Sequence, residues 1–111
     1  MININLLNKI IKFRDDRNWS QFHNSKDLAI SISLEAAELL ELFQWNNSKE
    51  AVNNYHQELQ DELADIMIYC ALMVDKLNID LDKAIEEKLE KNKEKYPVDK
   101  SYNSKEKYDQ L

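Results

Sequence analysis

Apolar side chains recur every three or four residues along most of this chain, which is the repeat of an amphipathic helix. The repeat predicts a first helix over residues 3–17, a second from Ser25 to about Trp45, a third over about 49–77, and a fourth from Asn78 or Asp80 to about Lys95. Residues 17–25 break the repeat with polar side chains. We expect a loop there that presents Trp19, Phe22 and His23.

The apolar stripes of the second and third helices indicate where the core should lie. The second helix should be capped by Ser25 and the third by Ser48, because serine oxygens accept bonds from the first free backbone N–H groups. The predicted core stripe of the second helix consists of Ala29, Ile32, Ala36, Leu39 and Phe43. The stripe of the third helix consists of Val52, Tyr55, Leu59, Leu63, Ile66, Cys70, Met73 and Leu77, beside a second stripe of Glu58, Glu62, Asp65, Tyr69 and Leu72. Residues 66–74 are apolar on most faces, which indicates burial in an oligomer.

The predicted fold is an all-α, four-helix antiparallel bundle. The sequence has no glycine, on which hairpins, phosphate-binding loops and dinucleotide fingerprints rely, and its single proline is Pro97. We expect one helical domain over residues 1–96. The remaining tail, 97–111, should pack on that domain or on a neighbouring subunit.

The composition narrows the location and the partners. Cys70 is alone within an apolar run, as is typical of a buried thiol in a reducing compartment. The sequence has no 18-residue apolar run and no signal-peptide pattern, so we expect a soluble, cytoplasmic protein without a membrane partner. The net charge of −6 argues against direct binding of nucleic acid, which needs a basic surface.

The acidic residues are concentrated in one segment. Residues 34–65 carry eight acids and one base, a net charge of −7, so the rest of the chain is nearly neutral at +1. Within it, Glu35 and Glu38 lie one helical turn apart, and so do Glu62 and Asp65. Such neighbours repel each other, by a few tenths of a kcal/mol per pair, and a divalent cation would offset the repulsion. A single pair would usually be a solvated helix face. Two pairs bordering apolar stripes on consecutive helices favour a shared metal site.

The donor types restrict the metal. A di-iron bundle site would need Glu-x-x-His on two helices, and neither His23 nor His56 follows a glutamate by three residues. Oxygen ligands alone favour Mg²⁺, with Mn²⁺ as a substitute. Mg²⁺ held by acids typically serves phosphate chemistry.

Four segments of the chain, two of which contain the acid pairs, resemble the motifs of a known protein family. They are Phe13-Arg14 followed by RNWSQFH at 17–23, then EAAELLELFQW at 35–45, ELQDELADIMIY at 58–69 and KYPV at 95–98. Together they resemble the MazG-like, all-α nucleoside triphosphate pyrophosphohydrolases, and most closely the dCTP pyrophosphatase branch. The chain departs from the family at Ala36-Ala37, where glycine is frequent, and at Lys26-Asp27 after the histidine loop. These departures leave the acids intact and bear on the substrate preference.

The resemblance implies hydrolysis of a nucleoside triphosphate to the monophosphate and pyrophosphate, with dCTP or a modified dCTP as substrate. It implies metal ligation by Glu35, Glu38, Glu62 and Asp65, and a water, oriented by Glu38 or Glu41, that attacks the α-phosphorus. It further implies a base pocket of Trp19, His23, Trp45 and Tyr69, and phosphate or sugar contacts from Lys88, Asn92, Lys95 and Tyr96. Family members form homodimers or homotetramers.

Three alternatives remain open. The chain could hydrolyse dUTP or another non-standard nucleotide on the same fold. It could be a helical interaction module in which the acids no longer act. It could also be a metal-buffering bundle that binds Mn²⁺ or Fe²⁺ without a nucleotide.

Overall fold

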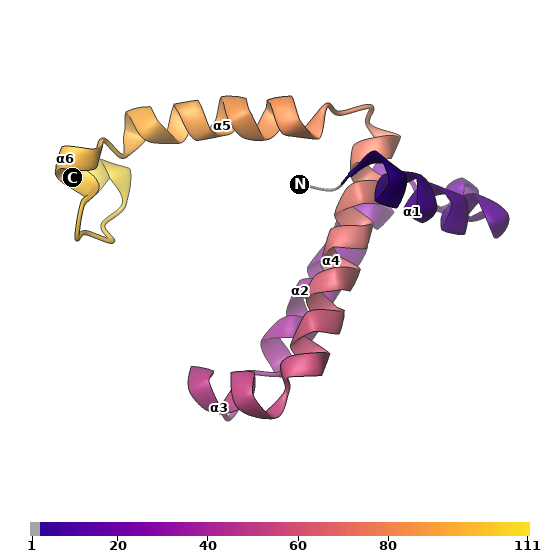
Figure 1. Cartoon of the computed structure of the whole chain (residues 1–111), viewed down its shortest axis with the longest axis horizontal. Coiled ribbons are helices and arrows are strands. Elements are labelled where there is room, and N and C mark those ends of the chain that lie inside the picture. Colours follow the sequence, from indigo (N-terminus) through magenta and orange to yellow (C-terminus); the bar gives the residue numbers. More distant parts are fainter. Residues whose placement is uncertain (1–2) are drawn as a thin grey trace. The chain divides into compact units, whose positions relative to one another are not determined.

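The computed structural model describes residues 3–111, and every regular element within that range is a helix (Figure 1). The elements are α1 (Ile4–Asp16), η1 (Trp19–Phe22), α2 (Ser25–Glu41), α3 (Ser48–Asn54), α4 (His56–Lys76), α5 (Leu81–Lys95), α6 (Val98–Ser101) and η2 (Tyr108–Gln110), where η marks a 3₁₀ helix. The all-α class is therefore confirmed. No helix in residues 3–111 is both long and apolar enough to cross a membrane.

The chain forms two compact units, one ending at Asn78 and one running from Ile79 to Leu111. The first unit contains α1 to α4 and all the predicted acidic ligands. The second contains α5, α6 and η2. The expected division into a 1–96 domain and a 97–111 tail stays a prediction.

Polar side chains fix the starts of four helices. Each accepts a hydrogen bond from the backbone N–H three residues further on: Asn3 for α1, Asn24 for α2, Asn47 for α3 and Asp80 for α5. Ser25 and Ser48 were therefore wrong as caps, because the asparagine before each of them occupies that position. Asparagine is at least as good a cap as serine, so either of two adjacent residues satisfied the sequence rule.

The expected helix over 49–77 is interrupted at Tyr55. The backbone there leaves the helical region, with φ −125° and ψ 30°, so α3 ends and α4 begins. The interruption needs neither proline nor glycine. Asn53 and Asn54 directly precede it, and asparagine favours turns over helix interiors because its side chain competes for backbone hydrogen bonds.

An antiparallel pair of helices, α2 and α4, is the centre of the first unit (Figure 1). Helix α1 also contacts α4, and α3 packs against the start of α4. The fully buried apolar side chains among the described residues are few: Leu28, Ala51, Ala71 and Leu72. Such a core is small for a chain of 111 residues.

The packed face of the helix pair agrees with the predicted stripes in part. On α4 it follows the second stripe, with Leu72 buried and Tyr69 half-buried, whereas Leu63 of the first stripe is 52% exposed. On α2, Ala29 and Ala36 of the predicted stripe are exposed. The remaining members of the expected stripes within α2 and α4 are half-buried: Ile32 and Leu39 on α2, and Leu59, Ile66, Cys70 and Met73 on α4. The acids and the helix contact therefore share one face, and part of the expected core stripe is open to solvent.

Candidate metal centre and adjoining pockets

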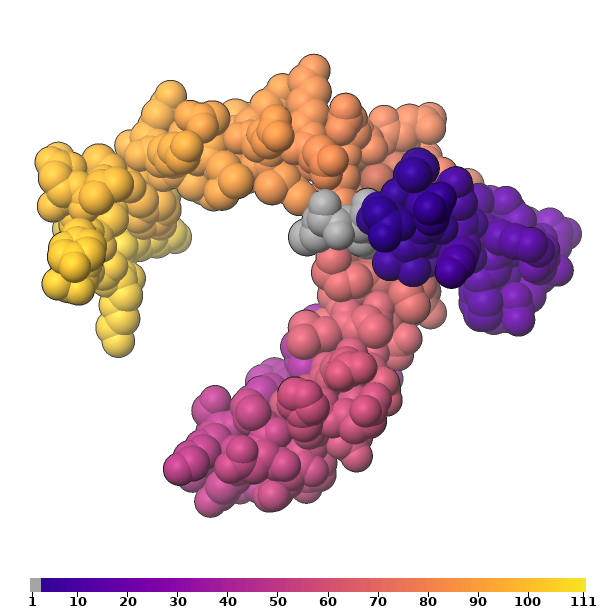
Figure 2. Space-filling model, in the orientation of Figure 1, coloured from indigo at the N-terminus to yellow at the C-terminus, as the bar shows by residue number. Residues whose placement is uncertain are grey.

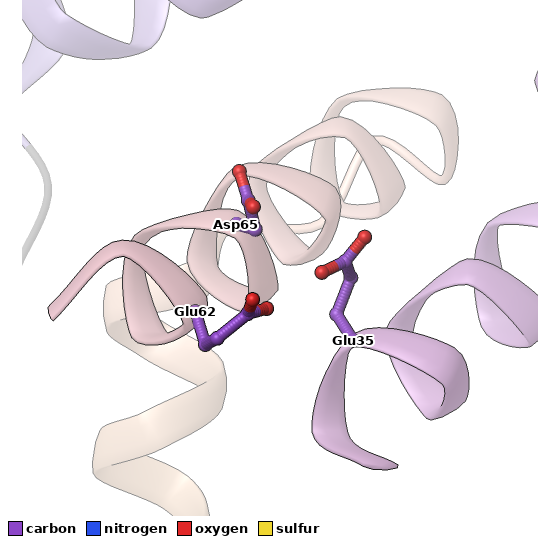
Figure 3. Close-up of side chains that lie close together, drawn as sticks. All are labelled: Glu35, Glu62 and Asp65. Atoms are coloured by element: carbon purple, nitrogen blue, oxygen red, sulfur yellow. The ribbon is translucent and has the colours of Figure 1, made fainter. Parts of the chain in front are cut away.

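Three carboxylates converge between α2 and α4 (Figure 3). Glu35 comes from α2, and Glu62 and Asp65 come from successive turns of α4. One oxygen of each lies within 4.8 Å of the others, close enough to share a single cation. The antiparallel packing of two helices brings together residues that are up to 30 positions apart in the sequence.

Two of the three converging carboxylates each have an oxygen that is buried from water and has no partner among the described residues. Oε2 of Glu35 and Oε2 of Glu62 are buried and accept no hydrogen bond within the described part of the chain. A buried, unpaired carboxylate oxygen is costly, because its hydration is lost without compensation. The pair of oxygens therefore fits a bound cation.

The charge balance of the cluster agrees with this interpretation. Burial, together with the nearby Glu38 and Glu62, raises the pKa of Glu35 from 4.5 to about 7. Burial raises the pKa of Glu62 as well, and the negative charges of Glu38 and Asp65 act in the same direction. A divalent cation would reverse both effects. All the donors are carboxylate oxygens, which Mg²⁺ and Mn²⁺ accept.

Glu38 and Glu41, the other predicted acids, lie beside the cluster rather than in it. Both are exposed and line a polar cavity of about 480 Å³, together with Glu62 and Tyr55. Glu38 is close enough to raise the pKa values of Glu35 and Glu62. The structure thus brings three of the four predicted ligands together and leaves Glu38 at the rim.

A second, more apolar pocket of about 270 Å³ has Asp65 in its lining. Its lining contains three residues predicted for base binding, Trp19, His23 and Tyr69. Phe13 and Trp19 meet edge to face, with ring centroids 5.7 Å apart, and Trp19 meets His23 in the same way at 6.5 Å. An aromatic pocket therefore adjoins the carboxylate cluster.

His23 has a free nitrogen in this pocket. Its Nδ1 is buried and has no partner among residues 3–111. Burial lowers the pKa of His23, and the positive charges of Arg14 and Lys76 lower it further. The imidazole is therefore neutral at pH 7, and its Nδ1 can donate or accept a hydrogen bond according to its tautomer.

Trp45 lies elsewhere. It follows the end of α2, lines neither pocket beside the carboxylates and is 92% exposed. Its φ of 68° is unusual for a bulky residue, and such strain tends to persist where surrounding structure or function maintains it. The structure does not bring Trp45 to Trp19, so its place in a base pocket stays a prediction.

The predicted phosphate or sugar contacts lie in the second unit. Lys88 and Asn92 lie on α5, and Lys95 is the last residue of this helix. Tyr96 is the C-cap of α5. Lys95 Nζ lies 4.8 Å from the ring centroid of Tyr108, and the ring of Tyr96 packs edge to face against the same tyrosine. Their role towards a substrate stays a prediction.

Two further residues line the aromatic pocket, Phe13 and Arg14, which the sequence analysis named in the family resemblance without giving them a role in the site. Arg14 is buried and bonded to Asp75 of α4. A signal existed in the sequence, because Arg14 continues the apolar stripe of Leu7 and Ile10 at helical spacing. A charged side chain on a buried stripe needs a partner.

Comparison with known proteins identifies relatives of this chain. A profile of the MazG-like family matches residues 30–111. The dCTP pyrophosphatase 1 of Rattus norvegicus is 35% identical over 105 residues, an alignment covering 90% of this chain and 62% of the relative. The dCTP pyrophosphatase 1 of Homo sapiens is 32% identical over the same extent. The chain thus spans about three fifths of the length of these curated relatives.

A solved structure also resembles this fold. A pyrophosphatase from Archaeoglobus fulgidus is 42% identical in sequence and superposes with a TM-score of 0.80. The superposition covers 84% of this chain and 90% of the other.

The raised pKa of Glu35 predicts how stability depends on pH in metal-free protein. The folded state keeps the Glu35 proton up to about pH 7, whereas the unfolded chain releases it near pH 4.5. The folded state therefore binds more protons in this window, and the free energy of unfolding should fall as pH rises from about 4.5 to about 7. Glu35→Gln removes the titrating carboxyl and its contribution to the free energy of unfolding. In thermal melts with EDTA, the melting temperature of this variant should therefore fall less than the parent's between about pH 4.5 and pH 7.

Glu87→Gln is the matched control, since the Glu87 side chain is 62% exposed and lies on α5. It should reproduce the parent's pH dependence. Identical pH dependence in parent and Glu35→Gln would contradict the burial of a protonated Glu35.

Proposed function

Because the chain belongs to the MazG-like family, we propose that it is a Mg²⁺-dependent nucleoside triphosphate pyrophosphohydrolase that converts a nucleotide of the dCTP type to the monophosphate and pyrophosphate. The observation that carries the proposal is the pair of buried, unpartnered oxygens of Glu35 and Glu62, placed beside Asp65 and an aromatic pocket. A site of this kind suits a ligand with a flat ring joined to a metal-chelating phosphate chain.

The residues of the cluster have distinct roles. Glu35, Glu62 and Asp65 would hold the metal, because their oxygens already converge. The bound ion supplies charge neutralisation and polarisation of the phosphate oxygens. Glu38 and Glu41 line the adjoining polar cavity, where either carboxylate can accept a hydrogen bond from a water molecule and hold it for attack.

The reaction is a displacement at the α-phosphorus. The water oxygen forms a bond to this phosphorus, the bond from the α-phosphorus to the bridging oxygen breaks, and pyrophosphate leaves. The proton released by the water passes to Glu38 or Glu41. Both residues are exposed, so this proton can then reach solvent.

The aromatic pocket supports the choice of a base as the other end of the substrate. Its volume of about 270 Å³ lies just below the range of about 300–1,000 Å³ for sites that hold drug-sized ligands, so it suits a single ring system. Trp19 and Tyr69 offer aromatic surface, and Nδ1 of His23 offers a hydrogen bond to a base edge. The base identity itself is part of the proposal.

Exposed apolar surface supports a homodimer or homotetramer. Leu34 and Leu40 on α2 are 60% and 69% exposed, and Leu63 on α4 is 52% exposed. Leu40 lines a shallow apolar groove of about 490 Å³ with Ala37 and Phe43. In Figure 2, α1 lies across one end of α4, and the length of α4 below it is visible on this side. A chain with so little buried apolar surface gains stability by burying these faces against copies of itself.

A panel of nucleoside triphosphates with Mg²⁺ tests the function. We expect release of pyrophosphate rather than phosphate, with dCTP or a modified dCTP preferred over the other nucleotides. Hydrolysis in ¹⁸O-water should label the monophosphate alone, because water attacks the α-phosphorus.

Glu35→Gln or Asp65→Asn should lower kcat about a hundredfold or more, the scale on which loss of one electrostatic stabiliser acts.

Glu87→Gln should retain parental turnover. Label in pyrophosphate would contradict attack at the α-phosphorus. A preference for dUTP would show that the proposed base is wrong but that the proposed reaction is right. Absence of hydrolysis across the panel would exclude the proposed activity as a nucleoside triphosphate pyrophosphohydrolase.

Metal binding has a readout that does not depend on catalysis. A ligand that binds only the folded state stabilises it by about 2.7 kcal/mol at a hundredfold excess over Kd. Millimolar Mg²⁺ should therefore raise the melting temperature by several degrees, and Na⁺ at equal ionic strength by much less. Glu35→Gln with Asp65→Asn should raise the metal-free melting temperature, because repulsion is removed, and should abolish the response to Mg²⁺. A parental Mg²⁺ response in this double variant would place the metal elsewhere.

Self-association can be measured by sedimentation velocity. The parent should sediment as a dimer or tetramer, whereas Leu40→Asp should shift it towards monomer, because a charge cannot be buried in the apolar groove without a partner. Asn8→Asp adds the same charge at an exposed position of α1 and should leave the distribution unchanged. A monomeric parent would contradict the assembly.

A further inference from the structure

A buried arginine connects the two sides of the aromatic pocket. Arg14 is 8% exposed and is the one buried charged residue in the described range 3–111. Its Nη1 donates to Oδ2 of Asp75 at 2.7 Å, and its Nε donates to Oδ1 of Asp15 at 2.9 Å. Asp15 belongs to the same helix, but Asp75 lies on α4, so the first bond joins α1 to α4.

The bond is not explained by stability alone. A buried ion pair contributes little net stability compared with apolar side chains of similar size, because both charges lose their hydration. Leucine would suit the apolar stripe of α1 at this position. The bonds to Asp15 and Asp75 raise the pKa of Arg14, so the guanidinium remains charged and keeps a fixed geometry. Such a group specifies how two helices are arranged.

The arrangement it specifies is that of the pocket. Arg14 itself lines the cavity, and its neighbour Phe13 packs against Trp19. The guanidinium carbon of Arg17 lies 3.8 Å from the centroid of the Phe13 ring, on the outer side of this aromatic group. The opposite wall is α4, with Tyr69 and Leu72 in the two turns that precede Asp75.

The bond also spans from the pocket to the metal helix. Asp75 follows Asp65 by ten residues, about 15 Å along α4. The ion pair thereby fixes the position of the aromatic wall on α1 and η1 relative to α4, the helix that supplies two of the three converging carboxylates. A ligand held at both places depends on this spacing, because small displacements of positioning groups weaken binding strongly.

We propose that the Arg14–Asp75 ion pair positions the aromatic wall formed by Phe13, Trp19 and His23 against Tyr69 of α4, and so sets the affinity for the ring of the substrate. Arg14 is a positioning residue in this scheme. The inference rests on the proposed nucleotide hydrolysis for its substrate, but its structural part can be measured without turnover.

The kinetic test compares Arg14→Met and Asp75→Asn with the parent. Arg14→Met removes the guanidinium that donates the bond to α4, and Asp75→Asn removes the negative charge with which that guanidinium pairs. The KM for the preferred nucleotide should rise on the order of tenfold, within the range that one base stacked on an aromatic ring contributes. The kcat should stay within about twofold, because the carboxylates are untouched, and Arg14→Lys, which keeps the charge, should recover part of the KM.

Lys12→Met is the matched control. It removes an ion pair of the same length, 2.7 Å to Asp16, from the exposed side of the same helix. Its KM should equal the parent's. Equal KM values in parent, Arg14→Met and Asp75→Asn would overturn the proposal, even if these variants melt at lower temperature, since that would reduce the ion pair to a stabilising contact.

A spectroscopic test uses the fact that the chain has two tryptophans. Trp45→Phe leaves Trp19, which is 43% exposed, as the single reporter. In this background Arg14→Met and Asp75→Asn should increase acrylamide quenching of Trp19, whereas Lys12→Met should not. The Mg²⁺-induced rise in melting temperature should persist in all of them.

The two proposals fail separately. A parent that hydrolyses no nucleotide would overturn the function, and the quenching data would still decide whether Arg14 positions the wall. Turnover by the parent, with unchanged KM and unchanged quenching in the variants, would overturn the positioning role and leave the function standing.

Discussion

Mutual repulsion among Glu35, Glu62 and Asp65 is the constraint on which the rest of the first unit depends. Three carboxylates lie within 4.8 Å in the seam between α2 and α4, where two of their oxygens have lost water. The metal-free fold reduces this cost by holding protons, as the raised pKa of Glu35 indicates. Proton retention and cation binding are alternative ways of neutralising the same charges. The remaining contacts of α2 and α4 must hold the helices together against this repulsion.

That requirement has a consequence for the surface. The face of α4 that meets α2 carries Glu62 and Tyr69, so the acids occupy positions that would otherwise form the core of the pair. Apolar residues such as Leu63 are displaced to the outside. A helix pair that places charges inside and leaves part of its apolar stripe outside gains less stability from its own packing. The proposed self-association would bury the exposed part of that stripe.

The sequence predicted the helices well and the packed face in part, for definite reasons. Helix starts follow from local hydrogen bonding, so the predicted caps of α2 and α3 were wrong by one residue only, with an asparagine in place of the adjacent serine. The interruption at Tyr55 was missed because its signal, two asparagines, is weak compared with proline or glycine. Periodicity found two stripes on α4 but could not decide which one meets α2, since a stripe that packs against another subunit has the same spacing. The pairing of Arg14 with Asp75 depends on tertiary geometry alone.

The two cavities beside the cluster divide a ligand by its chemistry. Glu62 adjoins a polar cavity with Glu38 and Glu41, and Asp65 adjoins the aromatic pocket. The polar cavity is acidic and would repel phosphate unless a cation were present. The aromatic pocket needs no cation to take a neutral ring. Under the proposed function, metal binding would control access of the charged part of a substrate, whereas the spacing between α1 and α4, which we propose Arg14 maintains, would control the fit of the uncharged part. Productive binding would then require both conditions in one ligand, so a free base or a simple polyphosphate would satisfy only half of the site.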